Sequence, residues 1–143
     1  MAQKPKPPSL SSRLAAAKEL GMVLGQESDV LNAKLAIVET EIINLQLGVG
    51  EAVDLPVGFE PWKLAFRKLG DEWGLCVIAE GKSPIPIENA SRPFRLAAVD
   101  TLKALIDAVI LKADEQIKEV RSGIEKLDAL IVELQPQGEE IPF

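Results

Sequence analysis

The chain contains few side chains that could carry out catalysis. Among its 143 residues there is no histidine and no tyrosine, and Cys76 is the only cysteine. A Ser–His–Asp triad and a zinc site built on histidine are therefore unavailable. One cysteine can form neither an internal disulfide nor a cysteine metal cluster. Because Cys76 lies in a strand-like segment and has no histidine to act as its base, we expect a buried, unreactive thiol.

Acidic side chains are numerous, but their spacing does not define catalytic pairs. Side chains at adjacent helical positions point in different directions, so nearness in sequence does not place two carboxylates together. The closely spaced pairs are Glu39 and Glu41, Asp114 and Glu115, and Glu139 and Glu140. Neither GVGEAVDL nor GFEPWKLAF matches a glycine-rich phosphate loop. We therefore predict that the protein is not an enzyme and uses no metal or cofactor; an enzyme relying on carboxylates alone is the weaker alternative.

Basic and aromatic residues offer a different chemistry, the binding of an anion. Arg92 and Arg95 fall in the first turn of a predicted helix, whose free N–H groups attract anions but whose dipole disfavours arginine. An anionic ligand or an acidic neighbour in the same chain would explain both. Tryptophan beside basic groups can stack on a base, although packing in the core is the usual role. The candidate ligand-binding residues are Lys63, Arg67, Lys82, Arg92, Arg95, Trp62 and Trp73.

The charge distribution restricts the partners. The net charge is −6, which argues against a general nucleic-acid binder and against a polybasic membrane protein. Residues 60–103 have a net charge of +1, whereas residues 21–59 and 104–143 each have −5. No run of about 18 uncharged apolar residues and no signal peptide is present, so a cytoplasmic protein is expected.

The first predicted element is a helix over about residues 13–47, preceded by a mobile Pro- and Lys-rich arm over residues 1–12. Ser9, Ser11 or Ser12 is expected to cap this helix. Gly21 and Gly25 could interrupt it, and glycines follow its end. Its second half has apolar residues at intervals of four and three, which is typical of a helix with one apolar face. These residues are Leu31, Leu35, Val38, Ile42 and Leu45.

A β-hairpin is predicted over about residues 62–80. The segment WKLAFRKLG alternates apolar and polar residues, and a Gly70-Asp71-Glu72 turn leads into a second strand-like run. A short edge strand around 52–57 would precede the hairpin, and the proline-containing segment 82–90 would return as extended chain. The face expected to lie on the helices carries Trp62, Leu64, Phe66, Trp73, Leu75 and Val77.

A second, longer helix is predicted over about residues 91–135. Ser91 can cap it and Pro93 is tolerated in its first turn. Its apolar stripe runs from Val99 to Leu134, with one extra interval of four around Ala113. If unbroken it is about 65 Å long, which is more than a hairpin and the first helix can cover. A break at Ser122-Gly123, folding the helix back into a monomeric three-helix bundle, is the alternative.

An uncovered stripe predicts self-association, since the simplest partner for an apolar helix face is a second copy of the chain. We expect a homodimer or higher homo-oligomer built on long antiparallel, coiled-coil-like helices. The candidate interface residues are Leu31, Leu35, Val38, Ile42, Val109, Ile117, Val120, Ile124, Leu127 and Ile131.

The run WGLCVI, followed by PIENASRPFRLAAV and a long charged helix, resembles a pattern in small uncharacterised bacterial and phage proteins. The resemblance covers about residues 62–105. It implies a helix–hairpin–helix arrangement, and it implies no activity and no role for any residue.

Taken together, these patterns predict an α+β fold in a single domain over 13–143, with the order α-β-β-α or α-β-β-β-α. The expected function is that of a non-catalytic interaction or assembly protein whose partner is itself, with another protein as a further possible partner. The alternative is a protein that binds a small anionic ligand or nucleotide at a subunit junction.

Overall fold

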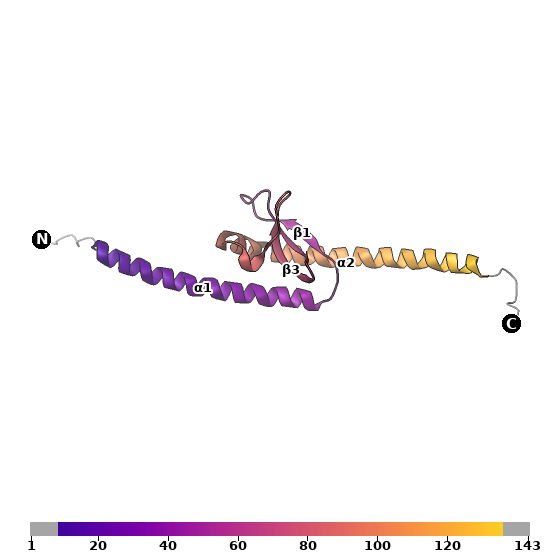
Figure 1. Ribbon diagram of the computed structural model, residues 1–143, viewed down its shortest axis with the longest axis horizontal. Coiled ribbons are helices and arrows are strands. Elements are labelled where there is room, and N and C mark those ends of the chain that lie inside the picture. Colours follow the sequence, from indigo (N-terminus) through magenta and orange to yellow (C-terminus); the bar gives the residue numbers. More distant parts are fainter. Residues whose placement is uncertain (1–8, 136–143) are drawn as a thin grey trace.

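The computed structural model describes residues 9–135, which form two long helices with a four-stranded antiparallel sheet between them (Figure 1). This arrangement confirms the predicted α+β class. The elements are α1 (Leu10–Asn44), β1 (Glu51–Asp54), β2 (Lys63–Leu69), β3 (Glu72–Ile78), β4 (Ile85–Pro86), the short 3-10 helix η1 (Ile87–Asn89) and α2 (Arg92–Leu134).

Helix α1 begins earlier than predicted. Ser9 is its N-cap, and the Ser9 hydroxyl oxygen accepts a hydrogen bond from the Ser12 backbone N–H at 3.1 Å. Residues 10–12 therefore belong to the helix and not to the predicted arm, whose residues 1–8 lie outside the described part of the chain. The helix continues through both internal glycines and ends at Asn44, three residues early, where Gln46 and Gly48 adopt positive φ angles of 52° and 66°.

The sheet has the strand order β1-β2-β3-β4, so each strand pairs with its neighbour in sequence. The predicted hairpin is present as β2 and β3, joined by a tight turn in which Gly70 has a φ of 65°. Strand β1 supplies the expected edge strand but begins at Glu51, so Gly50 lies directly before it. Strand β4, which was expected only as extended chain, pairs with Cys76 and Val77 of β3.

One face of the sheet packs against the helices and carries the predicted apolar residues. The register places Leu64 opposite Val77 and Phe66 opposite Leu75, and all four are buried. They join side chains of both helices in one hydrophobic core, with Trp62 and Trp73 half-buried at its border. On the opposite face Ala65 and Cys76 form a buried pair.

Helix α2 is continuous over 43 residues, which corresponds to about 65 Å. It passes through Gly123 without a break, so the alternative in which it folds back into a three-helix bundle is wrong. Its buried face also differs from the predicted stripe at its beginning, because Val99 is 45% exposed. The small residues Ala97 and Ala98 face the sheet instead, together with Thr101, whose hydroxyl donates to the Ala97 carbonyl at 2.7 Å.

The two helices run in the same direction and overlap only where they flank the sheet (Figure 1). Ser28 of α1 contacts Arg92 at the start of α2, and Ile42 and Val109 further along share the core. The first half of α1 and the second half of α2 therefore project from the sheet at opposite ends of the molecule. Residues 10–27 are all exposed, and so are residues 117–134 apart from Gly123.

Candidate interaction surfaces

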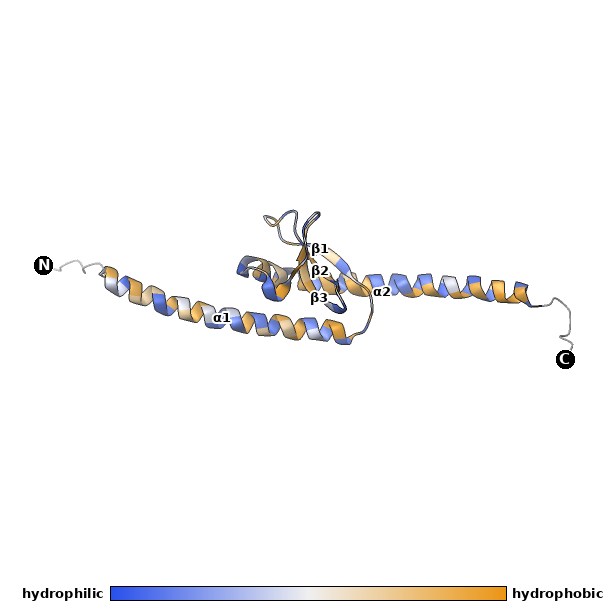
Figure 2. Ribbon diagram, in the orientation of Figure 1, coloured by the Kyte–Doolittle hydropathy of each residue, from blue (hydrophilic) through white to orange (hydrophobic). Residues whose placement is uncertain are grey.

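The projecting part of α2, residues 117–134, is called the α2 arm. Five of the predicted interface residues lie here at intervals of three and four, and their exposed fractions range from 48 to 59%. They are Ile117, Val120, Ile124, Leu127 and Ile131. Leu134, 82% exposed, extends the same stripe by one further step of three. Figure 2 shows apolar residues alternating with hydrophilic ones along this arm.

The other five predicted interface residues lie inside a single chain. Leu35, Ile42 and Val109 are buried in the core, and Leu31 and Val38 pack against it. The prediction that they contact another copy is wrong for the buried three, because the chain's own sheet and helices cover them. The same 4-3 periodicity thus occurs on a face that is covered and on a face that is not.

A second exposed apolar surface lies on residues 10–27 of α1, called the α1 arm, and was not predicted. Leu10, Leu14 and Leu24 are between 48 and 71% exposed. The signal was available in the sequence, since the 4-3 spacing continues upstream from Leu31 through Ser28, Leu24, Gly21, Ala17, Leu14 and Leu10. The small residues in this series weakened the apolar pattern and concealed it.

Three of the predicted anion-binding residues surround one hollow on the sheet face away from the helices. Lys63, Arg67 and Lys82 line this hollow, which has a volume of about 630 Å³. Glu80 also lines it, and the Lys63 Nζ lies 3.7 Å from an Asp54 carboxylate oxygen. The hollow is therefore basic on balance but contains one acidic group and one partly neutralised lysine.

The two remaining basic candidates lie elsewhere, where α1 meets the start of α2. Arg92 Nε donates a hydrogen bond to the Ser28 hydroxyl oxygen at 2.9 Å. Arg95 Nε is buried without a hydrogen-bond partner among the described residues, and so is Asn32 Oδ1. Asn32 lies one turn after Ser28 on α1, and Arg95 lies one turn after Arg92 on α2. Because the two helices run in the same direction, Asn32 and Arg95 lie on the same side of the Ser28–Arg92 hydrogen bond. The five basic residues of the predicted site are thus divided between two places.

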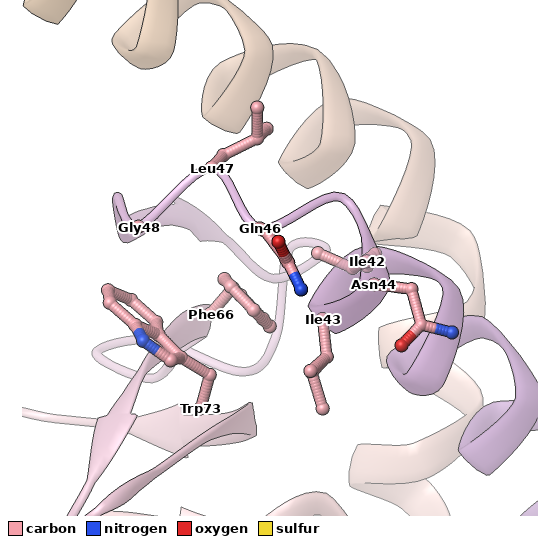
Figure 3. A pocket seen from close by; sticks show the side chains of 8 residues that line it. All are labelled: Ile42, Ile43, Asn44, Gln46, Leu47, Gly48, Phe66 and Trp73. Atoms are coloured by element: carbon pink, nitrogen blue, oxygen red, sulfur yellow. The ribbon is translucent and has the colours of Figure 1, made fainter.

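Both tryptophans pack on phenylalanines. The Trp62 ring meets Phe94 of α2 edge-on at 5.3 Å between centroids, and the Trp73 ring stacks on Phe66 at 5.4 Å with 17° between the planes. The Trp62 contact joins the residue before β2 to α2, whereas the Trp73 contact joins β3 to β2, and both are packing roles. Trp73 and Phe66 also line a hollow of about 350 Å³ beside the end of α1 (Figure 3).

The Cys76 thiol is fully buried in β3. Burial raises its pKa to about 11, and the nearby Arg67 guanidinium opposes this only in part. Because the thiolate is the nucleophilic form, the thiol is unreactive at neutral pH. Among residues 9–135, no group of three or more histidine, cysteine, aspartate or glutamate side chains is placed to hold a metal ion. Neither α1 nor α2, as far as the chain is described, combines the length and the apolar character that a membrane crossing requires.

No protein-family model matches the chain, and no curated protein or solved structure is significantly similar to it.

Proposed function

We propose that this protein is a non-catalytic assembly protein that associates with itself through the α2 arm. The observation that supports this most strongly is the length of helix that projects beyond the sheet with an apolar stripe exposed. A helix of this length is only marginally stable in water without tertiary packing. A continuous exposed apolar surface is also typical of a protein-interaction site. The α2 arm therefore gains stability when its stripe is covered.

A second copy of the chain is the partner that fits the stripe best. The spacing of three and four residues is that of helices that pack side by side in a coiled coil. Each copy presents the same stripe on its α2 arm, so two copies can cover these two stripes symmetrically. A different protein with a similar helix is the competing partner.

Several features favour a non-catalytic role. The chain has no histidine, and its one thiol is buried and has a raised pKa. A single reduced cysteine is usual in cytoplasmic proteins, which is where we place this protein.

The proposal is tested with two matched valine substitutions on the α2 arm. Val120 lies on the stripe and is 59% exposed, whereas Val132 lies off the stripe and is 64% exposed. Val120→Glu places a charge in the interface of both copies, so self-association measured by sedimentation equilibrium should weaken by about tenfold or more. Val132→Glu should leave it unchanged. A wild-type chain that stays monomeric up to about 100 µM has a dimer dissociation constant above that concentration, and this result would refute the proposal.

The hollow lined by Lys63, Arg67 and Lys82 supports a second candidate function, the binding of a small anion or nucleotide. Three cations converge on it from β2 and from the segment after β3. This site lies on the sheet and not at the proposed subunit junction. ATP and inorganic phosphate are suitable probes in titration calorimetry. Arg67→Gln should weaken ATP binding by about tenfold, whereas Lys68→Gln, the adjacent exposed position, should not. No heat of binding with either probe would remove this candidate.

A further inference from the structure

We infer that two α2 arms pair in antiparallel orientation, with Arg121 of each chain beside Asp128 of the other. This inference rests on the proposed self-association and adds to it the direction and register of the partner helix. It would place the two sheets at opposite ends of a shared helical pair.

The stripe of the α2 arm fixes which residues flank it. Its six apolar residues follow one another at intervals of 3, 4, 3, 4 and 3, which assigns them to the a and d positions of a heptad repeat. They are Ile117, Val120, Ile124, Leu127, Ile131 and Leu134. Arg121 and Asp128 each follow a d residue and occupy e positions. Gly123 and Leu130 each precede an a residue and occupy g positions.

An antiparallel partner covers this stripe without a gap. Each layer then joins an a residue to a d residue, as when Ile124 packs against the partner's Leu127 and Val120 against the partner's Ile131. Ile117 and the partner's Leu134 close the end of the pair. The arms overlap over 18 residues, or about 27 Å. The buried part of each chain lies before residue 117, so the sheets stay apart.

The charges favour this orientation. Reversing one helix places e positions against e positions, so Arg121 lies beside the partner's Asp128, and by symmetry this pair forms twice. Neither residue has an ion-pair partner within 4.0 Å among the described residues of its own chain. In a parallel pair, g faces e, so Arg121 would meet the partner's Gln116 and Asp128 would meet the partner's Gly123. Only the antiparallel pair joins opposite charges.

The other flank of the stripe is complementary in size. Antiparallel pairing also places g against g, so Leu130 lies over the partner's Gly123. Leu130 is 52% exposed in a single chain, and a Cβ at Gly123 would meet nothing within 4 Å. The space beside Gly123 can therefore receive a leucine side chain from the partner.

A charge-exchange series tests the register. Arg121→Asp and Asp128→Arg each place like charges together twice per dimer, so each should raise the dimer dissociation constant about tenfold at low salt. The double variant restores opposite charges and should return close to wild-type affinity. Sedimentation equilibrium gives the constants, and circular dichroism confirms that each variant is folded. Equal effects of the single and double variants would overturn the inference.

Spin-label distances test the orientation independently. Single cysteines replace Lys118 or Lys126 in a Cys76→Ala background of the full chain. In the antiparallel register the two labels at 126 lie almost opposite each other, whereas those at 118 are offset by 15 residues, about 22 Å along the axis. Label separations should therefore differ between the two sites. Equal separations at both sites would indicate a parallel pair and overturn the inference.

A substitution on the α1 arm separates failure of this inference from failure of the proposed function. Leu14 is 61% exposed on the α1 arm, and Leu14→Glu should leave the dimer constant unchanged. A loss of association by Leu14→Glu would mean that the α1 arm takes part in the contact between copies. That outcome overturns the antiparallel α2 pair but keeps self-association. A wild-type monomer overturns both.

Discussion

The carboxylate of Glu39 on α1 accepts a hydrogen bond from the backbone N–H of Leu75 in β3, with 2.7 Å between nitrogen and oxygen. Strand β4 pairs only with Cys76 and Val77, so it ends before reaching Leu75. The Glu39 carboxylate therefore takes the place of the backbone acceptor that a longer β4 would offer to the Leu75 N–H. It satisfies a backbone donor at the edge of the sheet and connects α1 to β3.

We predict that Glu39→Ala lowers the free energy of unfolding by about 1–3 kcal/mol, because a partly buried N–H loses its charged acceptor. Glu39→Gln keeps an acceptor oxygen and should cost less. Glu41→Ala, an exposed position on the same helix, should change stability by less than about 0.5 kcal/mol. Urea unfolding monitored by circular dichroism measures all three. Equal losses at 39 and 41 would show that the contact to Leu75 contributes nothing.

Two glycine substitutions should have opposite effects. A Cβ at Gly50 would lie 2.6 Å from the Phe66 carbonyl oxygen and 3.3 Å from the Trp73 ring. Gly50→Ala should therefore destabilise the fold by about 1–3 kcal/mol, since backbone atoms have to move. A Cβ at Gly21 of α1 meets nothing within 4 Å, so Gly21→Ala should increase helix stability by about 0.5–1 kcal/mol. Thermal unfolding of both variants checks the two signs.

Local sequence patterns predicted the elements of this fold but not what covers each apolar face. Alternation located β2 and β3, and the 4-3 spacing located both helices. The same spacing at Leu35 and at Ile124 predicted an interface between copies at both residues. Leu35 is instead buried within its own chain, whereas Ile124 is exposed. The difference depends on where β1 to β3 dock, which is a tertiary property.

Two details of the structure could not be predicted from the sequence, for a related reason. The face of α2 that contacts the sheet begins with Ala97, Ala98 and Thr101, which contribute little to an apolar pattern but allow close approach. The basic candidates were expected together, but they separate because Arg67 lies on the outer sheet face and Arg92 lies at the contact between the helices. Both outcomes depend on how the helices and the sheet pack against one another, which short-range periodicity does not describe.

The buried Cys76 thiol predicts a loss of stability at high pH. Its pKa is raised from 9.0 to about 11 on folding, so between these values the unfolded chain loses a proton that the folded chain keeps. Stability is therefore fully present below pH 9 and falls by about 2 kcal/mol as the pH approaches 11. Urea unfolding from pH 8 to 11 measures this fall. Cys76→Ala removes the Cys76 contribution, so a wild-type curve parallel to that of the variant would contradict the prediction.

Hydrogen exchange should separate the α2 arm from the rest of the molecule. Amides of the sheet open only with the core, so their exchange should not depend on protein concentration. Residues 117–134, apart from Gly123, are exposed in a single chain, so the amides of the α2 arm should exchange rapidly after a roughly hundredfold dilution that dissociates the proposed dimer. At high concentration the partner helix of the proposed dimer should protect them. The α1 arm, residues 10–27, is equally exposed but unpaired in the proposed dimer, so it should exchange rapidly at both concentrations. If protection rises with concentration in the α1 arm and not in the α2 arm, the interface lies on α1 and the proposal is contradicted.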